Sequence, residues 1–365
     1  LGTYTHSVLL VENKLYSKDN PLIMSEYRQA FNNGNLVIDT GYTKGFQNES
    51  SIKKKGDKSH FFSKFVKEFI YENGSESSFE LDIQHISNDK YLKLYKIESS
   101  LVDNDIDFLE NSLSFTYDHD DLFLGMNAKV YETLKDNYSD KYEYIFPSLT
   151  LDKNLFSNKK VGIMDLQTNI EVRNYDTNKT SKYFVNDFVW NIKNFNYASG
   201  IRGKFLNNIK NVNYKSDNIP GFKEKSTSEL FNAFGYLTEV DFFKKTENQT
   251  LQKLSPKALF RYGSGPMKKE ADGARIDTSN IFTMDRLENL NQFETGLSAT
   301  LGFDYEFENY NKNFLLSMGQ IINEKEDKDF PSSSSLDEKL SDVVGKTSLE
   351  INKKFTFNYD FALDQ

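Results

Sequence analysis

Apolar and polar side chains alternate along this chain with a period of two. From Phe293 to Phe307 the odd positions are mainly apolar or aromatic, whereas the even positions from Gln292 to Glu306 are mainly polar. Successive side chains of a β-strand point to opposite faces, so this segment has one apolar wall and one polar wall. The C-terminal segment alternates in the same way around a turn near 352–354, which predicts a hairpin.

Similar runs recur over the whole chain and predict about 18 strands, separated by turn-forming residues. Composition does not shift as it would at a linker, so we expect one architectural unit. The expected strands are 3–13, 21–31, 35–44, 59–71, 77–87, 91–102, 106–118, 120–132, 142–152, 161–174, 181–193, 195–206, 227–244, 249–262, 291–308, 313–323, 341–352 and 354–364.

The length of these strands separates two classes of β-protein. Strands of soluble sheets average about five or six residues, whereas several here alternate for about twice that length. In 291–308 the apolar wall is bracketed by Phe293 and Phe303. Ten residues span about 33 Å along a strand, or about 25 Å along the membrane normal at a tilt of about 40°, which matches a lipid-facing band between aromatic girdles. The pattern therefore predicts an all-β fold, a large antiparallel transmembrane β-barrel of the outer-membrane type.

The lengths of the connections support this prediction. Outer-membrane barrels have short turns on one side and long loops on the other. The long connections 207–226, 263–290 and 324–340 alternate with short ones, and another long connection lies at 45–58. The number of strands placed between 45–58 and 207–226 is odd, however. We therefore expect one error in the strand count between residues 59 and 206.

Composition excludes several other classes. The chain has 365 residues, no cysteine and a net charge of −9. Thiolate chemistry is absent, and the acidic balance argues against a nucleic-acid partner. Mean hydropathy is −0.64, and no apolar run approaches the roughly 18 residues of a membrane helix. Because the chain starts without an initiator methionine and ends within an alternating pattern, we expect it to be part of a longer protein.

Candidate chemistry is sparse. The four histidines have no ligand spacing, and 103–107 lacks the glycine and glutamate of a calcium loop. Residues 85–89 contain Ser, His and Asp, but a catalytic triad is defined by geometry across the fold and not by adjacency, so we expect a polar strand end and turn there. We therefore expect no enzyme, no cofactor and no metal. A polar lumen is the candidate site, and on 291–308 its lining residues are Glu294, Ser298, Thr300, Asp304 and Glu306. A soluble antiparallel sandwich or secreted adhesin remains the alternative for the alternation alone.

Short strings go beyond the general pattern of barrels. In chain order they are SEYR (25–28), SNDKYLKLY (87–95), LSPKALFRY (254–262), NIFTMDR (280–286), ETGL (294–297), GFDY (302–305), GQ (319–320), SSL (334–336) and LSDVVG (340–345). As an ordered set, this segment resembles the barrel domain of the LptD family of LPS-assembly outer-membrane proteins, also called organic solvent tolerance proteins.

The resemblance implies a fold and a role. Family members carry a periplasmic jellyroll before a barrel of about two dozen strands. Residues 1–365 would then be part of one barrel domain, with the jellyroll and closing strands outside them. The implied activity is transport and insertion of lipopolysaccharide (LPS) into the outer leaflet. The implied partners are an LptE-type lipoprotein plug, LPS, periplasmic LPS-transport bridge proteins and outer-membrane lipids.

Several polar residues match positions in these motifs: Arg28, Ser87, Asn88, Asp89, Arg261, Arg286, Gln320, Ser341 and Asp342. We expect them to be structural or lumenal residues, because charges inside a barrel usually pair with one another. The alternative function is a porin or a nutrient receptor of the outer membrane. The ordered motifs count against it.

Overall fold

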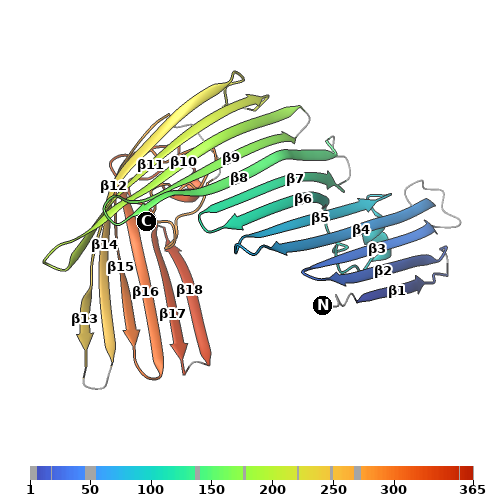
Figure 1. Cartoon of the computed structure of the whole chain (residues 1–365), viewed down its shortest axis with the longest axis horizontal. Coiled ribbons are helices and arrows are strands. Elements are labelled where there is room, and N and C mark those ends of the chain that lie inside the picture. The colour runs from blue at the N-terminus through green and yellow to red at the C-terminus, as the bar shows by residue number, and fades with distance from the viewer. Residues whose placement is uncertain are drawn as a thin grey trace. The chain divides into compact units, whose positions relative to one another are not determined.

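The computed structural model describes residues 6–17, 19–45, 55–135, 140–175, 178–219, 222–246, 250–266, 273–352 and 354–364. These residues form 18 strands of one sheet, a short α-helix and a 3-10 turn (Figure 1). No helix among them is long and apolar enough to cross a membrane. The predicted all-β, antiparallel class is confirmed.

The strands follow one another in the chain with short or long connections. Their bounds are β1 Ser7–Lys14, β2 Leu22–Phe31, β3 Gly34–Gly45, β4 Lys55–Ile70, β5 Glu76–Ile86, β6 Phe108–His119, β7 Leu122–Thr133, β8 Tyr142–Asn158, β9 Gly162–Tyr175, β10 Lys179–Asn196, β11 Ile201–Asp217, β12 Thr227–Val240, β13 Phe242–Lys245, β14 Leu251–Ser264, β15 Gly296–Glu308, β16 Lys312–Asn323, β17 Val343–Ile351 and β18 Phe355–Leu363.

The chain divides into two compact units. The first comprises Leu1–Asp152, Asn169–Lys182 and Lys215–Lys225, and the second comprises Lys153–Thr168, Tyr183–Tyr214 and Ser226–Gln365. In the first unit, β1 to β7 pair in sequence order, each antiparallel to the next. In the second, β11, β12 and β14 to β18 pair in the same way.

One predicted strand is wrong. Residues 91–102 contain the helix α1 (Tyr91–Tyr95) and an irregular segment instead of a strand. Tyr91, Leu92 and Tyr95 are buried in a core with residues of β2 and β4, such as Leu22 and Phe62. Their spacing at positions i, i+1 and i+4 places them on one face of a helix. The alternation that predicted a strand at 91–102 was therefore misleading. Without this strand, eight strands, β4 to β11, lie between the connection that follows β3 and the connection that precedes β12. The number is even, so this error is the expected miscount.

Other boundaries also differ from the expectation. The predicted strand 195–206 is split, because β10 ends at Asn196 and β11 begins at Ile201 and continues to Asp217. The region 207–226 is therefore mostly strand. Its polarity misled the sequence reading: Asn207 Nδ2 donates to Asn232 Oδ1 (2.8 Å), and Asn211 Nδ2 donates to Ser228 Oγ (3.3 Å), which makes a hydrogen-bonded ladder. The predicted strand 227–244 is two strands, β12 and β13.

On β14 and β15 of the second unit, several exposed side chains are apolar and several buried ones are polar. On β15, Leu297 and Leu301 are about half exposed, at 48% and 49%, whereas Ser298 and Thr300 on the other face are buried. On β14, Phe260 and Tyr262 are exposed, and Arg261 between them is buried. A soluble sheet has the opposite arrangement, whereas a barrel wall in lipid has this one.

The described residues of two long connections pack against the polar face of the second unit. They are 265–295, between β14 and β15, and 324–342, between β16 and β17. The short connections from β15 to β16 and from β17 to β18 lie at the other ends of these strands. Ile276, Ile281, Leu287, Phe330 and Leu336 of the two long connections form a buried cluster. This cluster also includes Ile321 and Val344 of the strands. The expected alternation of long and short connections is therefore present here.

Candidate functional site

The candidate site is the polar network between the connection 265–295 and the inner face of β14 and β15. Its strand residues are Arg261 of β14 and Ser298 and Thr300 of β15. Alternation places all three on the covered face. The connection contributes Arg286 and Glu294, and both side chains are buried.

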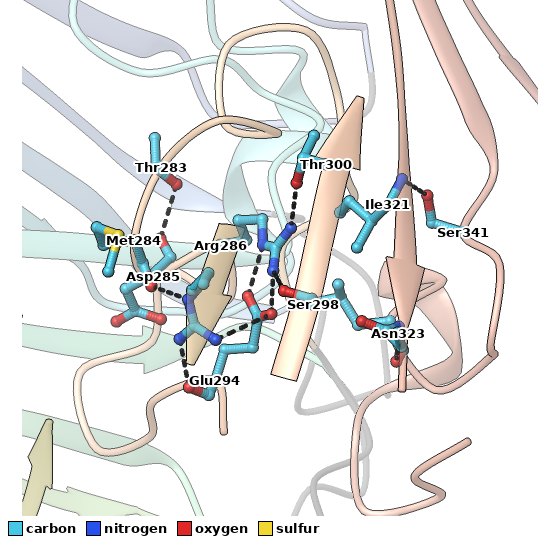
Figure 2. A network of polar contacts seen from close by, with 12 residues as sticks. Thr283, Met284, Asp285, Arg286, Glu294, Ser298, Thr300, Ile321, Asn323 and Ser341 are labelled. Atoms are coloured by element: carbon cyan, nitrogen blue, oxygen red, sulfur yellow. Dashed lines mark hydrogen bonds and ion pairs between the residues drawn. The ribbon is translucent and has the colours of Figure 1, made fainter. Parts of the chain in front are cut away.

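Arg286 and Glu294 form the centre of the network (Figure 2). Arg286 Nε donates to Glu294 Oε2 at 2.7 Å, and its Nη2 atom donates to the other carboxylate oxygen. This is a two-point contact between guanidinium and carboxylate, a strong geometry for an ion pair. Arg286 also donates to Thr300 Oγ1 (3.0 Å) and Ser298 Oγ (2.8 Å). The guanidinium of the connection is thus fixed to β15.

Arg261 fixes the same connection to β14. Its Nε atom donates to the carbonyl oxygen of Met284 at 2.7 Å, and its Nη2 atom donates to the carbonyl oxygen of Glu294. Its Nη1 atom lies 3.3 Å from Glu294 Oε1. The guanidinium also faces the Phe293 ring, 5.4 Å from its centroid. Two arginines therefore share one carboxylate, and Arg261 also donates to the backbone carbonyls of Met284 and Glu294.

Two nearby guanidinium groups lower the pKa of the buried Glu294 carboxyl. Burial alone raises the pKa of this carboxyl, but Arg261 and Arg286 outweigh burial and leave the pKa below its ordinary value. Glu294 therefore stays ionised in the network. Asp285 behaves in the opposite way, because burial raises its pKa more than Lys210 lowers it.

Lys210 of β11 makes a second attachment that the sequence reading missed. Its Nζ atom donates to Asp285 Oδ2 at 3.1 Å and to the carbonyl oxygen of Gln292 at 2.9 Å. The sequence predicts a long connection at 207–226, so Lys210 is not among the predicted site residues. In the structure, Lys210 shares one face of β11 with buried Leu206, Asn208 and Val212. The sequence of 206–213 has no apolar wall, so it offers no signal for this strand.

The structure brings together some of the predicted site residues. Glu294, Ser298 and Thr300, which were expected to line a lumen, meet Arg261 and Arg286 from the motifs. Glu294 precedes β15 instead of lying on it, and Phe293 beside it is fully buried. Phe293 is therefore not an aromatic bracket on the outer wall, because it packs against Phe231.

The other predicted residues lie elsewhere. Asp304 pairs with Lys257, and Glu306 lies 3.2 Å from Lys253, on the polar face of β15 and β14. Two hydrogen bonds attach β16 to the second long connection: Gln320 donates to the Ser341 carbonyl (2.9 Å), and Ser341 Oγ accepts from the Ile321 amide (2.9 Å). Asp342 of the second long connection lies 3.3 Å from Arg275 of the first.

Four motif residues belong to the first unit. Arg28 pairs with Glu26 on β2. Ser87 Oγ accepts from the Ser59 amide (2.8 Å), and Asn88 Oδ1 accepts from the Lys90 amide (3.1 Å) at the start of α1. Asp89 pairs with Lys141 at 3.1 Å. These contacts are structural, and a lumenal role for the predicted residues stays a prediction.

The arrangement suits mechanical attachment better than catalysis. Within the described residues, no group of three or more His, Asp or Glu side chains is placed to hold a metal. The buried charges pair with one another, and backbone carbonyls and hydroxyl groups accept further hydrogen bonds from the basic side chains. The network holds a long connection against the polar wall of a sheet whose other wall is apolar.

Comparisons with known proteins agree with this architecture. A family model described as LptD, LPS transport system D, matches residues 61–365. This range includes both long connections of the second unit and all residues of the network. No curated protein matches the chain.

Proposed function

The chain belongs to the LptD family of LPS transport proteins, and from that premise we propose that it forms the barrel wall through which LPS leaves a lipoprotein-plugged lumen. Membership establishes the coarser function: the protein acts in LPS transport and assembly at the outer membrane. The family is one of transport proteins, so its substrate is LPS and its partners belong to the LPS-transport pathway.

The finer proposal concerns partners and domain organisation. We propose an LptE-type lipoprotein in the lumen, periplasmic LPS-transport bridge proteins as the donors of LPS, and outer-membrane lipids against the apolar wall. Residues 1–365 would belong to one barrel domain without catalytic chemistry. The barrel is supported best by the distribution of side chains on β15. Ser298 and Thr300 are buried on one face, while Leu297 and Leu301 are exposed on the other.

The polar face of the sheet provides a suitable environment for the saccharide part of LPS during transport. The saccharide part of LPS is hydrophilic and its acyl chains are apolar. A wall with a polar lumenal face and an apolar outer face can accommodate both parts if the lipid passes sideways between strands. No bond is broken in such a step, which agrees with a site composed of ion pairs and hydrogen bonds.

The test uses the full-length parent protein, affinity-purified from membranes in mild detergent. We expect a small lipoprotein and LPS to co-purify in stoichiometric amounts. Depletion of the protein in cells should reduce the appearance of newly made LPS at the surface. A heat-modifiable barrel with neither companion, and with unchanged surface LPS after depletion, would instead identify a porin or receptor.

A further inference from the structure

Two lysines lie on the outer face of neighbouring strands. Lys182 of β10 is exposed beside buried Ser181, and Lys215 of β11 is exposed beside buried Tyr214. Tyr214 shares one face of β11 with Lys210, which donates to a carbonyl of the long connection that packs on the sheet. Because successive side chains of a strand alternate, Lys215 points away from that polar face. Both lysines belong to the first unit.

The pairing of the two strands places the lysines beside each other. β10 and β11 are neighbours in the sheet, and the short turn 197–200 between them makes them antiparallel. Asn213 Nδ2 donates to the carbonyl oxygen of Phe184 at 3.2 Å, so these two residues are opposite each other. Two positions further toward the same edge, Lys182 is opposite Lys215.

The two ammonium groups lack a counterion. Among the residues that the structure describes, no carboxylate forms an ion pair with Lys182 or Lys215. Asp217 shares the outer face of β11 with Lys215 but pairs with neither lysine. Like charges directly opposite each other on a sheet are destabilising. An anion between the ammonium groups removes this repulsion, and lysine binds phosphate well as a point charge.

The position along the strands selects the kind of anion. β12 starts beside the end of β14, where the connection 265–295 begins. β11 ends beside the start of β12, since Tyr214 is opposite Thr227. Long connections of outer-membrane barrels face outward, and the family places this chain in the outer membrane. Lys215, the residue after Tyr214, is therefore near the outward rim of the wall.

An apolar surface begins directly below the lysines. Phe184 is the next residue of β10 on the outer face, and its ring is exposed. Acyl chains cover the apolar band of a barrel wall, so the rim above it lies at the level of lipid headgroups. Lysine stems pack on apolar surface while their ammonium groups stay in the polar layer. A lipid phosphate fits this position better than a free phosphate ion, because its acyl chains contact Phe184.

We propose that Lys182 and Lys215 together bind one phosphate group of an outer-leaflet lipid on the outer wall of the barrel. The ligand is the phosphorylated headgroup of lipid A, the membrane anchor of LPS. The site goes beyond LPS transport, because it lies on the wall opposite the lumen and holds a lipid that is already part of the leaflet.

Native mass spectrometry of the delipidated full-length complex, titrated with bisphosphorylated lipid A in detergent, tests the site. The double variant Lys182→Gln/Lys215→Gln should raise the apparent dissociation constant of one bound lipid A at least about fivefold, since two ammonium–phosphate contacts are lost. Lys182→Arg/Lys215→Arg keeps both charges and should bind as the wild type does. The matched control is Lys193→Gln, an exposed lysine near the other end of β10, which should leave binding unchanged.

Heat-modifiable gel mobility should verify that all variants fold, and lipid A without phosphate should bind equally to wild type and the glutamine variant. Equal binding of bisphosphorylated lipid A by these two proteins would overturn the site. Displacement of that lipid by an excess of inorganic phosphate would overturn the preference for a lipid. Surface LPS should stay normal in cells with the glutamine variant, and its loss would show that the lysines act in transport instead. None of these failures affects the proposed function, which depletion of the whole protein tests.

Discussion

Arg286 and Glu294 are the residues on which attachment of the connection 265–295 depends most. Both are buried, and together they contact Arg261, Ser298 and Thr300. Removing one partner of a buried ion pair leaves the other charge without compensation in a medium that solvates it poorly. Exposed pairs have no such penalty, because water solvates the remaining charge.

We therefore predict that Arg286→Met lowers the free energy of local opening of this connection by about 3–5 kcal/mol. Hydrogen exchange of the amides at 284–294 in the full-length complex measures this quantity. The control is Lys346→Met, because Lys346 lies 3.7 Å from Asp360 in an exposed pair. It should cost less than about 1 kcal/mol. Equal effects of the two changes would contradict the central role of Arg286.

Protonation of Glu294 at low pH should weaken the attachment of the connection 265–295 to β14 and β15. Its pKa in the folded protein is lowered, so ionised Glu294 stabilises the fold above its ordinary pKa, and this stability is lost as pH falls through the lower folded value. Asp285 has a raised pKa, so its protonation comes earlier and favours the folded form.

A spin label at the exposed position Glu288 should therefore stay immobile on mild acidification and become mobile only below the ordinary carboxyl range. In Glu294→Gln the label should be mobile at neutral pH as well, and the acid transition should disappear. A wild-type label that becomes mobile near neutral pH would show that another group controls the attachment.

Individual residues also show what the sequence could and could not reveal. Period-two alternation identified Ser298 and Thr300 on the covered face, and the motif strings identified Arg261 and Arg286. Neither signal could show that Glu294 and Arg286 meet, because residues eight apart in an irregular connection have no fixed geometry. Lys210 was missed because an asparagine-rich strand has the composition of a loop.

At the scale of elements, two glycines allow the long connection to lie close to the sheet. Gly302 of β15 is opposite Gly319 of β16. A Cβ atom on Gly302 would lie 2.4 Å from the Met318 carbonyl oxygen and 2.9 Å from Phe282 of the connection. On Gly319 it would lie 3.0 Å from Ile281. The pair therefore forms a notch that receives Ile281 and Phe282.

Gly302→Ala should thus displace Phe282 and cost about 1–3 kcal/mol, as overpacking of a close contact does. Protease cleavage within 273–295 in the folded complex should become faster. The control is Gly125→Ala on β7, where the nearest atom to the new Cβ is a ring carbon of Phe123 at 3.3 Å. If both substitutions leave cleavage unchanged, the notch does not hold the connection.

Strands with regular alternation of apolar and polar residues were predictable from the sequence. Elements whose residues are determined by contacts with parts of the chain distant in sequence were not. The strands β2, β7, β16 and β18 lie within a residue or two of their expected bounds. Helix α1 was predicted as a strand because its apolar residues are selected by packing against Leu22 and Phe62. Such tertiary contacts are not encoded in a local period.

At the scale of the whole molecule, the second unit gives the sheet a direction, because long connections join β14 to β15 and β16 to β17 at one end of these strands and short turns lie at the other. Family membership places such a sheet in the outer membrane, where long connections of barrels face outward and short turns face the periplasm. β16 offers a direct comparison, since Tyr310 precedes it in a short turn and Glu326 follows it in a long connection.

Glu326→Cys should therefore react with a membrane-impermeant maleimide on intact cells, whereas Tyr310→Cys should react only after the outer membrane is permeabilised. Both positions are exposed, and no cysteine of residues 1–365 competes for the reagent. Labelling with the reverse preference would mean that the sheet crosses the membrane in the opposite direction.

The alternation of Leu297 and Leu301 with Ser298 and Thr300 also affects the export of the unfolded protein across the inner membrane. The unfolded chain passes through a secretion channel as a linear sequence, in which polar neighbours lower the mean hydropathy around each apolar residue. No stretch is therefore apolar enough to be retained in the inner membrane as a helix. The lipid-facing surface comes into existence only when strands pair. An outer-membrane protein of this kind can thus cross one membrane as a polar polymer and enter the next as an apolar one.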